Sequence, residues 1–371
     1  MNSPQTQSYW ESTEWLQPPD LLIVGGGIVG ASTALFYKQK YPNHSVIILD
    51  KGMMPEGAST RNAGFTCIGS ISEHLADMET AGEDVVFGRI KRRWSGLNLL
   101  KETLGEDAIG YKPTGGHEIF TDAELFETCC DRITEINRQL QERIGIGDVY
   151  RSTEYEGHPA IFNRVEGAIN SGRMMRQLHR RLAELGVETR WNCRVTSIDN
   201  GTVALQNGLQ IKPGKLVVAT NGFTRQLTDL PIKPARGYVF VTKPLADLAW
   251  RGTFHFDEGY IYFRDVDERL LIGGARNIAM AKEETDEFGV NQTIKDHLIR
   301  FVNDTLQIPE GWEIEQEWSG IMGMTENKEP IIKKLNPTTW AAAGLSGMGI
   351  AIGMQVARDL LQQIGPPDIT S

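Results

Sequence analysis

The chain has 371 residues, a length that corresponds to two or three domains at roughly 150 residues each. Its formal charge of −10 argues against nucleic acids and anionic membrane surfaces as partners, because these bind cationic surfaces. Hydrophobic residues make up 40% of the chain and charged residues 23%, a balance typical of a globular protein and unlike a disordered one.

Signals for export and for metal binding are missing from the sequence. No Lys or Arg precedes Lys38, so the charged start of a secretory signal is absent, and no apolar run reaches the roughly 20 residues of a membrane helix. The four cysteines and seven histidines show no zinc-ligand spacing. We therefore expect a cytoplasmic protein with reduced thiols, no integral membrane segment and no metal.

The first predicted elements are a strand, a glycine turn, a helix and a second strand. Asp20–Val24 is a short apolar run that leads into three glycines, Ile28–Tyr41 has helical composition, and Val46–Leu49 is a β-branched run closed by Asp50. Together these elements have the size of one βαβ unit, which is about 30 residues. Residues 1–17 precede the unit as a polar N-terminal extension.

Longer helices and short strands follow along the chain. Composition predicts helices at 72–104, 121–144 and 171–185, the second of them with a capping-box pattern at its start. The run Lys91-Arg92-Arg93 is expected to form a solvated face of the first of these helices. Short apolar runs predict strands at 115–120, 187–191, 195–198, 202–205 and 215–219.

The C-terminal part of the chain predicts more sheet and a closing helix. Alternating β signals run from Gly237 to Gly274, a helix is expected at 291–306, and a strand at 339–343 leads through a glycine-rich turn into a last helix. The whole pattern predicts an α/β (α+β) fold with a Rossmann-like domain and a discontinuous, antiparallel-sheet substrate domain. The first would comprise residues 18–70, 151–230 and 320–371, and the second residues 71–150 and 231–319.

The clearest chemical motif is the glycine turn after the first strand. Gly25–Gly30 reads GGGIVG, a G-x-G-x-x-G match. Its first glycine allows a tight turn, its second a close approach to a pyrophosphate, and its third close packing of helix on strand. The start of the following helix offers N–H groups to phosphates, and Asp50 ends the second strand where a ribose-binding carboxylate belongs. The motif therefore predicts a dinucleotide site.

A second glycine-rich turn near the C-terminus bears on which dinucleotide is bound. Ala343–Gly349 reads AGLSGMG, follows a predicted strand and opens the last helix. The N-terminus of a helix stabilises negative charge, such as that on a reduced ring system. This second turn favours FAD over NAD.

With these motifs in place, the chain resembles the FAD-dependent amine and amino-acid oxidases of the D-amino acid oxidase superfamily over nearly its whole length. The resemblance is nearest to the gamma-glutamylputrescine oxidase and glycine oxidase-like branch. Besides the two glycine turns, it lies in Gly57–Gly64 along the flavin ring, Glu166–Ile169 before the middle helix, Val217–Gly222 beside the cofactor, Arg236–Tyr238, the hairpin of Tyr260–Arg264 with Ile272–Gly274, and the closing signature Trp318–Pro330.

The resemblance implies a bound FAD and places it on particular residues. Subgroups with covalent flavin use a His in the ring-facing segment or a Cys in the closing signature, and Arg61 and Met322 stand at those positions here. We therefore expect non-covalent FAD. The implied cofactor-binding residues are Gly25, Gly27, Ile28, Val29, Gly30, Asp50, Lys51, Ser59, Thr60, Arg61, Asn62, Ala63, Gly64, Val195, Thr220, Asn221, Gly222, Gly344, Ser346, Gly347, Met348, Gly349 and Ile350.

The family's usual partners for a substrate carboxylate are replaced in this chain. Members acting on D-amino acids often have an Arg where Met322 stands, and sarcosine-oxidase-like members have a Lys where Ala351 stands. A carboxylate would then need another cation, such as Arg264, Arg276 or Arg61. The alternative is an amine substrate without a carboxylate near the reacting carbon.

The substrate pocket is expected on the predicted hairpin of the second domain. Tyr260, Tyr262 and Arg264 alternate along their strand and so share one face of it. With Tyr238 on a neighbouring strand and Arg276 beyond the hairpin, they are the candidates for lining the pocket. No side chain is identified as a general base.

The resemblance implies oxidation of the C–N bond of an amine or amino acid. Hydride transfer to FAD gives an imine, water hydrolyses it, and O2 takes up the electrons as H2O2. Two alternatives stay open: a dehydrogenase of the same fold that passes electrons to a quinone or protein, and a non-catalytic FAD-binding subunit. An NAD-dependent dehydrogenase is disfavoured by the second glycine turn. The sequence leaves the substrate, the electron acceptor and the oligomeric state open.

Overall fold

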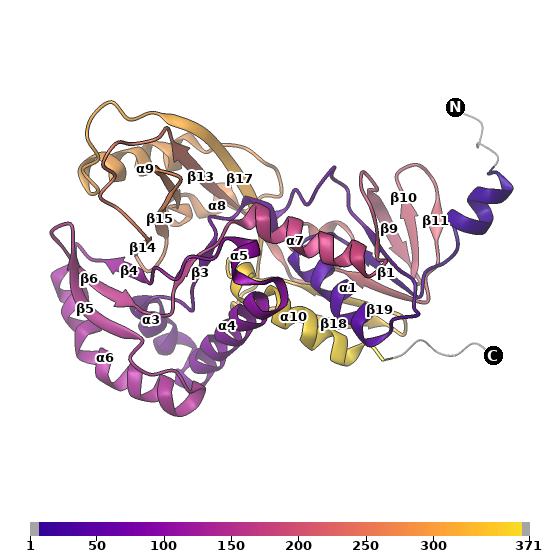
Figure 1. The fold of residues 1–371 in the computed structure, drawn as a ribbon, viewed down its shortest axis with the longest axis horizontal. Helices are drawn as coiled ribbons and strands as arrows, with labels where there is room; N and C mark the ends of the chain where they lie inside the picture. Colours follow the sequence, from indigo (N-terminus) through magenta and orange to yellow (C-terminus); the bar gives the residue numbers. More distant parts are fainter. Residues whose placement is uncertain (1–6, 366–371) are drawn as a thin grey trace.

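The computed structural model describes residues 7–365, which form two lobes of different construction (Figure 1). One lobe is built on a six-stranded sheet with the strand order β18-β19-β12-β1-β2-β8. All neighbouring pairs in this sheet are parallel except β18 with β19. The strands are β1 (Leu21–Val24), β2 (Val46–Leu49), β8 (Glu188–Arg190), β12 (Lys215–Val218), β18 (Ile331–Asn336) and β19 (Thr339–Ala343).

The central strand of this sheet is apolar throughout because both of its faces are covered. Leu21 and Ile23 pack against the helices α1 (Ile28–Lys40), α7 (Ser171–Glu184) and α10 (Gly349–Gln363). The alternate side chains, Leu22 and Val24, belong to the core formed with a small sheet of three strands. That sheet consists of β9 (Val195–Asp199), β10 (Thr202–Leu205) and β11 (Gln210–Ile211). This arrangement confirms the predicted Rossmann-like architecture.

The second lobe is built on an eight-stranded sheet with the order β17-β13-β16-β15-β14-β4-β6-β5. Its pairs are antiparallel except β14 with β4, and aromatic side chains such as Phe240, Phe254 and Phe263 form its core with helix α9 (Gln292–Asp304). The strands are β4 (Gly116–Ile119), β5 (Tyr150–Tyr155), β6 (His158–Asn163), β13 (Lys233–Thr242), β14 (Thr253–Phe256), β15 (Ile261–Val266), β16 (Arg269–Gly274) and β17 (Ile314–Met324).

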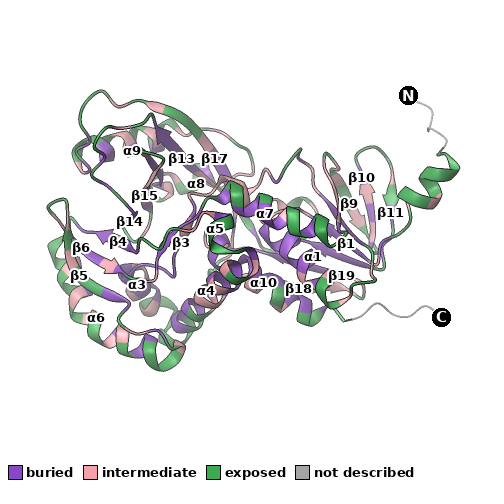
Figure 2. Cartoon of the chain, viewed as in Figure 1, coloured by how far each residue is buried: buried purple, intermediate pink, exposed green. Residues whose placement is uncertain are grey.

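Helices and short segments join the two lobes. Helix α4 (Glu83–Leu104) packs on α10, and the two-stranded sheet of β3 (Phe65–Thr66) and β7 (Gly167–Ala168) lies between the lobes. Figure 2 shows exposed outer faces on α6 and on the short N-terminal helix η1. The remaining elements are η1 (Glu11–Trp15), α2 (Ala58–Arg61), α3 (Ile71–Ala81), α5 (Glu106–Ile109), α6 (Ala123–Ile144), η2 (Asn221–Gln226), η3 (Arg276–Ala279) and α8 (Met280–Glu283). Among residues 7–365, no helix has both the length and the apolar composition to cross a bilayer.

Two of the predicted helices differ from the observed ones. The helix expected at 72–104 is two helices, α3 and α4, separated by Gly82 with φ +84°, a conformation that favours glycine. The next helix begins at Ala123, and Asp122 rather than Thr121 caps it, because its Oδ1 accepts the amides of Glu124 and Leu125 at 2.9 and 3.2 Å.

The expected segment boundaries also shift. Strands β5 and β6 form a hairpin in the eight-stranded sheet, so residues 151–163 belong to the second lobe and not to the Rossmann-like lobe. Strand β17 pairs with β13 along its length and continues past residue 320, where the sequence placed a boundary. These domain boundaries depend on which distant strands pair by hydrogen bonds. The composition along the chain does not reveal that pairing.

Candidate functional site

A cavity of about 560 Å³ extends between the two lobes. Its walls come from the turns after β1, β2 and β12, from residues 57–69, from strands β13 to β17 and from the turn that opens α10. We use "dinucleotide end" for the part beside the glycine turn after β1, and "substrate end" for the part lined by α3, β13–β17 and residues 325–328. The carboxyl ends of parallel strands are the usual binding edge of such a sheet.

The glycines after β1 have separate physical roles. Gly25 adopts φ +107°, and a Cβ there would lie 2.5 Å from the Ala219 carbonyl oxygen. A Cβ at Gly30 would lie 2.0 Å from the Gly25 oxygen, so helix α1 approaches the turn too closely for any side chain. A Cβ at Gly27 would meet only the Ser59 hydroxyl, at 3.0 Å. Gly27 therefore opens the backbone toward the cavity, as the pyrophosphate role requires.

A carboxylate and two cations lie at the dinucleotide end. Asp50 accepts the amides of Gly26 at 2.7 Å and Gly52 at 2.9 Å, which fixes its side chain beside the glycine turn. Burial raises the pKa of Asp50. Burial and the neighbouring Arg194 guanidinium lower the pKa of Lys51, so a bound anion would favour the charged form of this lysine.

Residues 57–64 form a rigid segment along the cavity. The Asn62 side chain donates to the Ala58 and Ser59 carbonyls at 3.0 and 2.9 Å and accepts the Gly64 amide at 2.9 Å. The Ser59 hydroxyl accepts the Ile28 amide at 2.9 Å, so this hydroxyl occupies one of the donors at the start of α1. Arg61 donates to the Ser319 carbonyl at 3.0 Å, which ties the segment to the second lobe.

The C-terminal glycine turn needs three left-handed residues, Gly344, Ser346 and Gly347, with φ of +81°, +47° and +85°. The Asn221 side chain holds this turn by accepting the Gly344 amide at 3.1 Å. Helix α10 then begins at Gly349, and its first residues line the cavity. A helix N-terminus presents unpaired N–H groups, so this wall favours negative charge in the cavity.

Most residues expected at the cofactor lie in the cavity wall, and four lie behind it. Thr60 donates to the Pro55 carbonyl, and Gly222 has no room for a Cβ because the Met322 oxygen would be 2.6 Å away. Gly30 and Gly344 likewise shape the turns without lining the cavity. The lining members are Gly25, Gly27, Ile28, Val29, Asp50, Lys51, Ser59, Arg61, Asn62, Ala63, Gly64, Val195, Thr220, Asn221, Ser346, Gly347, Met348, Gly349 and Ile350.

Three of the five pocket candidates line the substrate end. Tyr260, Tyr262 and Arg276 lie in the cavity wall. Tyr238 does not, because it packs in the aromatic core of the second lobe and donates its hydroxyl to Glu317. Arg264 is also outside the wall. Its Nη1 donates to the carbonyls of Gly64 at 3.1 Å and Ile169 at 2.9 Å, so it joins β15 to residues 57–64 and to the segment before α7.

Replacing Arg264 by glutamine should therefore reduce stability and not substrate recognition directly. The shorter amide cannot reach the carbonyls that the guanidinium joins, and charged hydrogen bonds of this kind contribute about 1.5–3 kcal/mol each. We expect the free energy of unfolding in urea to fall by about 3 kcal/mol. Arg276→Gln, at the half-buried cavity rim, should leave it unchanged. An Arg264→Gln protein of native stability would contradict this assignment.

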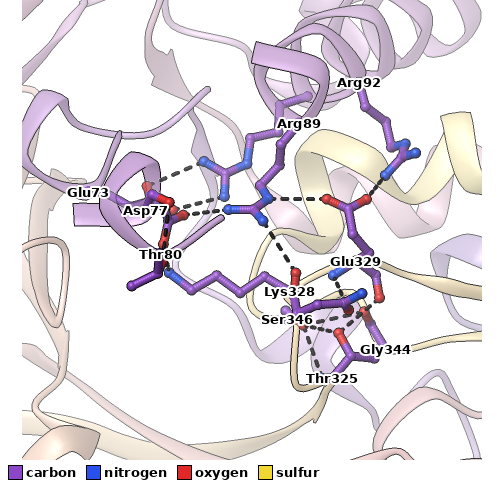
Figure 3. A network of polar contacts seen from close by, with 12 residues as sticks. Glu73, Asp77, Thr80, Arg89, Arg92, Thr325, Lys328, Glu329, Gly344 and Ser346 are labelled. Carbon is purple, nitrogen blue, oxygen red and sulfur yellow. Dashed lines mark hydrogen bonds and ion pairs between the residues drawn. The ribbon is translucent and has the colours of Figure 1, made fainter. Parts of the chain in front are cut away.

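A network of ion pairs at the substrate end was not predicted (Figure 3). Arg89 on α4 pairs with Asp77 on α3 at 2.5 Å and with Glu329 at 3.2 Å, and Lys328 pairs with Asp77 at 2.6 Å. Arg93 is buried and pairs with Glu73 at 2.9 Å, which corrects the expectation that Lys91-Arg92-Arg93 is a solvated face. The sequence contained one indication of this network. Glu73 and Asp77 are four residues apart on α3, and Arg89 and Arg93 are four residues apart on α4, so each pair lies on one face of its helix.

Phe65, Cys67 and His255 also line the cavity and were missed, because the sequence does not show that residues 65–67 meet strand β14. Phe65 on β3 contacts the rings of His255 on β14 and Tyr262 on β15, with centroids 5.2 and 5.7 Å apart. Cys67, Glu166 and His255 bring one potential metal ligand each within 4.8 Å of one another. His255 Nε2 and Glu166 Oε1 are 2.6 Å apart, however, whereas two ligands on one tetrahedral zinc lie roughly 3.4 Å apart. The geometry fits a hydrogen-bonded pair better than a metal site.

The dinucleotide end fits FAD on several independent observations. Gly27 leaves the phosphate approach open, Asp50 is held where a ribose hydroxyl would lie, and two helix N-termini face the cavity. A family model described as FAD dependent oxidoreductase matches residues 20–363, which is most of the chain.

Individual relatives are distant in sequence. The chain is 22% identical over 367 residues to the probable oxidoreductase OrdL of Haemophilus influenzae, covering 91% of this chain and 80% of that protein. Solved structures share the fold, and two of them serve as examples. Glycine oxidase from Geobacillus kaustophilus has a TM-score of 0.74 at 20% identity, covering 95% of this chain and 97% of that one. L-Proline dehydrogenase from P. horikoshii has a TM-score of 0.73 at 18% identity, covering 95% and 96%. On the strength of the family match, this chain belongs to the FAD dependent oxidoreductase family, and FAD is its cofactor.

Proposed function

We propose that this protein oxidises the carbon–nitrogen bond of a small amine or amino acid, with non-covalent FAD as hydride acceptor and O2 as the final oxidant. The main support is the continuity of the cavity. It passes from the glycine turn along residues 57–64 to a wall that contains Tyr260 and Tyr262. A substrate held against these rings would lie beside the segment that resembles the flavin-facing part of the family. The fold shared with a glycine oxidase is consistent with this chemistry.

The side chains at the substrate end suggest how the substrate is held. Met322 and Ala351 line the cavity at the positions where relatives carry cations, so neither provides a carboxylate partner. Arg276 also lines the cavity, and its Nη1 contacts only the Met280 sulfur, at 3.0 Å, among the described residues. It therefore has donors left for a carboxylate. Arg264 and Arg61 are engaged with backbone carbonyls.

The protein's part in the reaction is to orient the substrate and to limit water at the reacting carbon. FAD, when bound, supplies the hydride acceptor. Tyr262, Phe65 and Met322 provide apolar surface around the substrate end, and the start of α10 favours negative charge near the ring system. Loss of hydride from the carbon leaves an iminium, and water hydrolyses it to a carbonyl compound and an amine or ammonia.

A dehydrogenase reaction is the second candidate. One solved structure with this fold is an L-proline dehydrogenase, so the fold is compatible with acceptors other than O2. The two candidates share the first half-reaction and differ only in where the electrons go next. Oxygen uptake that stays at background while substrate reduces the flavin would favour the dehydrogenase.

The decisive experiment is an absorption spectrum followed by an anaerobic titration. Purified protein should show oxidised flavin, and acid denaturation followed by filtration should release all of the colour, because Arg61 and Met322 form no flavin link. Glycine, L-proline and short aliphatic amines are then added without oxygen. Bleaching by one of them supports the proposal. Flavin that none of them reduces would favour a non-catalytic FAD-binding subunit, and colour that stays with the polypeptide would contradict non-covalent binding.

A further inference from the structure

His255 lines the substrate end and forms a buried pair with Glu166 behind it, and the chemistry proposed so far gives this pair no role. His255 Nε2 is 2.6 Å from Glu166 Oε1, and the two residues are 8% and 1% exposed. The glutamate fits only because residue 116 is a glycine, since a Cβ there would come within 2.4 Å of the Glu166 carboxyl carbon. A buried carboxylate is costly unless it is paired, so the pair is a specific feature of this site.

His255 is placed among residues that face the expected substrate. On the sheet it lies directly opposite Tyr262, and both rings contact Phe65, which follows the ring-facing segment by one residue. All three residues line the cavity. The pair therefore borders the space beside the ring-facing segment and is not part of the aromatic core.

The two ring nitrogens of His255 have different surroundings. Nε2 is committed to Glu166, whereas Nδ1 has no hydrogen-bond partner within residues 7–365. Gly259, another cavity-lining residue, lies beside Nδ1, and even a Cβ there would stay 3.8 Å away. A carboxylate that accepts Nε2–H selects the tautomer in which Nδ1 carries a lone pair. The accessible nitrogen is then a proton acceptor.

A small aliphatic amine reaches the substrate end as its ammonium form, because the pKa of such an amine is near that of a lysine side chain, about 10.4. Glu73, Asp77, Glu258 and Glu326 line the wall there together with Arg93, Arg276 and Lys328. An ammonium nitrogen has no lone pair and cannot support loss of hydride from the adjacent carbon. A proton acceptor in the wall would remove this obstacle.

The pKa of His255 is raised above the ordinary histidine value. Burial lowers the pKa of His255, but the carboxylates of Glu166, Glu118 and Glu73 outweigh that effect and leave it above the ordinary value. The pKa values of several neighbouring groups are shifted as well. Arg93 holds the pKa of Glu73 at about 2 against the effect of burial, and burial raises the pKa of the Cys67 thiol well above its usual range. Glu118, with its pKa raised by burial, hydrogen-bonds to Ser72.

We propose that His255 accepts the proton of the substrate ammonium through Nδ1 and that Glu166 positions it. This inference rests on the proposed amine chemistry. The substrate N–H bond breaks, the Nδ1–H bond forms, and the electron pair stays on the substrate nitrogen. That pair becomes part of the C=N bond when hydride leaves for the flavin. The imidazolium charge is balanced by the Glu166 carboxylate, and the proton later passes to water or to the released amine.

The kinetic test compares His255→Gln, Glu166→Gln and His117→Gln in the FAD-loaded protein. His117 is a matched control, because it lies on the neighbouring strand β4 and does not line the cavity. The rate of anaerobic flavin reduction by the active amine should rise with pH through one ionisation above 6.5, the ordinary histidine value. His255→Gln should abolish that rise and slow reduction by about 100-fold. Glu166→Gln should move the rise to lower pH, and His117→Gln should change neither. A rise that persists in His255→Gln would overturn the proposal.

A second measurement does not depend on turnover, and its main readout uses the wild-type protein. In the wild-type protein labelled with 15N-histidine, one imidazole should show a protonated Nε2 and an unprotonated Nδ1 and titrate above pH 6.5. Its signal should shift in Glu166→Gln and stay unchanged in His117→Gln. A proton on Nδ1 in the neutral imidazole would overturn the assignment even if amines reduce the flavin. Failure of every amine to reduce the flavin, with this tautomer present, would instead contradict the proposed function.

Discussion

Gly27→Val should yield a folded protein that no longer retains FAD. Gly27 has φ −71° and ψ −177°, a backbone conformation open to valine, and its only close neighbour is the Ser59 hydroxyl. The added methyl groups would occupy the approach to the start of α1, where the backbone must come close to the pyrophosphate. We expect FAD affinity to fall by roughly 100-fold or more, equivalent to about 3 kcal/mol of binding free energy.

Substitutions at two other glycines distinguish a loss of FAD binding from a loss of protein stability. Gly30→Ala brings a Cβ within 2.0 Å of the Gly25 oxygen, so it should lower the free energy of unfolding by about 3 kcal/mol or more. Gly88→Ala, on the exposed side of α4 with open space around it, should keep full FAD binding and gain up to about 1 kcal/mol. FAD affinity is measured by fluorescence titration of apoprotein and stability by urea unfolding. Normal FAD binding by Gly27→Val would refute the assigned role.

The Rossmann-like lobe was predictable because its signals are local. The strand, turn and helix around Gly25–Gly30 are adjacent in the sequence, and glycine is required at Gly25 and Gly30 because a Cβ there would clash with the backbone. The second turn was predictable for the same reason, down to the helix that begins at Gly349. Asn221 was assigned to the cofactor from its motif. The structure adds that its side chain holds the C-terminal turn, a contact between residues more than a hundred positions apart.

The substrate end was less predictable because it is assembled from distant segments. Tyr262 and Arg264 alternate along β15 as expected, but Tyr260 precedes the strand, and only the two tyrosines reach the cavity. Arg264 turns to the carbonyls of Gly64 and Ile169, and no pattern around residue 264 indicates that those carbonyls are within reach. The parallel pairing of β14 with β4 also has no local signal. It brings His255 beside Glu118 and toward Glu166, and so creates the pair that sequence reasoning missed.

Lowering the pH should destabilise the protein through His74, which is buried on α3. Its Nε2 lies 3.0 Å from the Tyr150 hydroxyl, and that hydroxyl donates its proton to the Gly69 carbonyl at 2.7 Å. His74 must therefore be the donor in this contact, with its proton on Nε2. Burial lowers the pKa of His74 to about 4, from 6.5 in the unfolded chain. Between pH 6.5 and about 4, His74 is therefore protonated in the unfolded chain and neutral in the folded protein.

The sign of the effect follows from proton linkage. Above pH 6.5 both states are neutral at His74 and the residue contributes nothing to the pH dependence. As the pH falls from 6.5 toward 4, only the unfolded chain takes up the proton, so stability is lost, in total about 3 kcal/mol. Glu73 affects the stability in a lower range of pH. Its folded pKa of about 2 means that its contribution is lost only as the pH falls from 4.5 toward 2.

The His74→Gln variant distinguishes the pH range in which His74 affects stability from the lower range in which Glu73 does. Glutamine keeps an N–H donor for Tyr150 but has no proton to gain, so the decline between pH 6.5 and 4 should become shallower by about 3 kcal/mol while the decline below 4.5 remains. Urea unfolding of FAD-saturated protein across this range measures both. His117, whose pKa burial also lowers to about 4, should produce its own part of the upper decline, and His117→Gln controls for it. An unchanged upper decline in His74→Gln would mean that His74 is protonated in the folded protein. In that case the ion-pair network of α3 and α4, and not a neutral histidine, would set the acid stability of the substrate end.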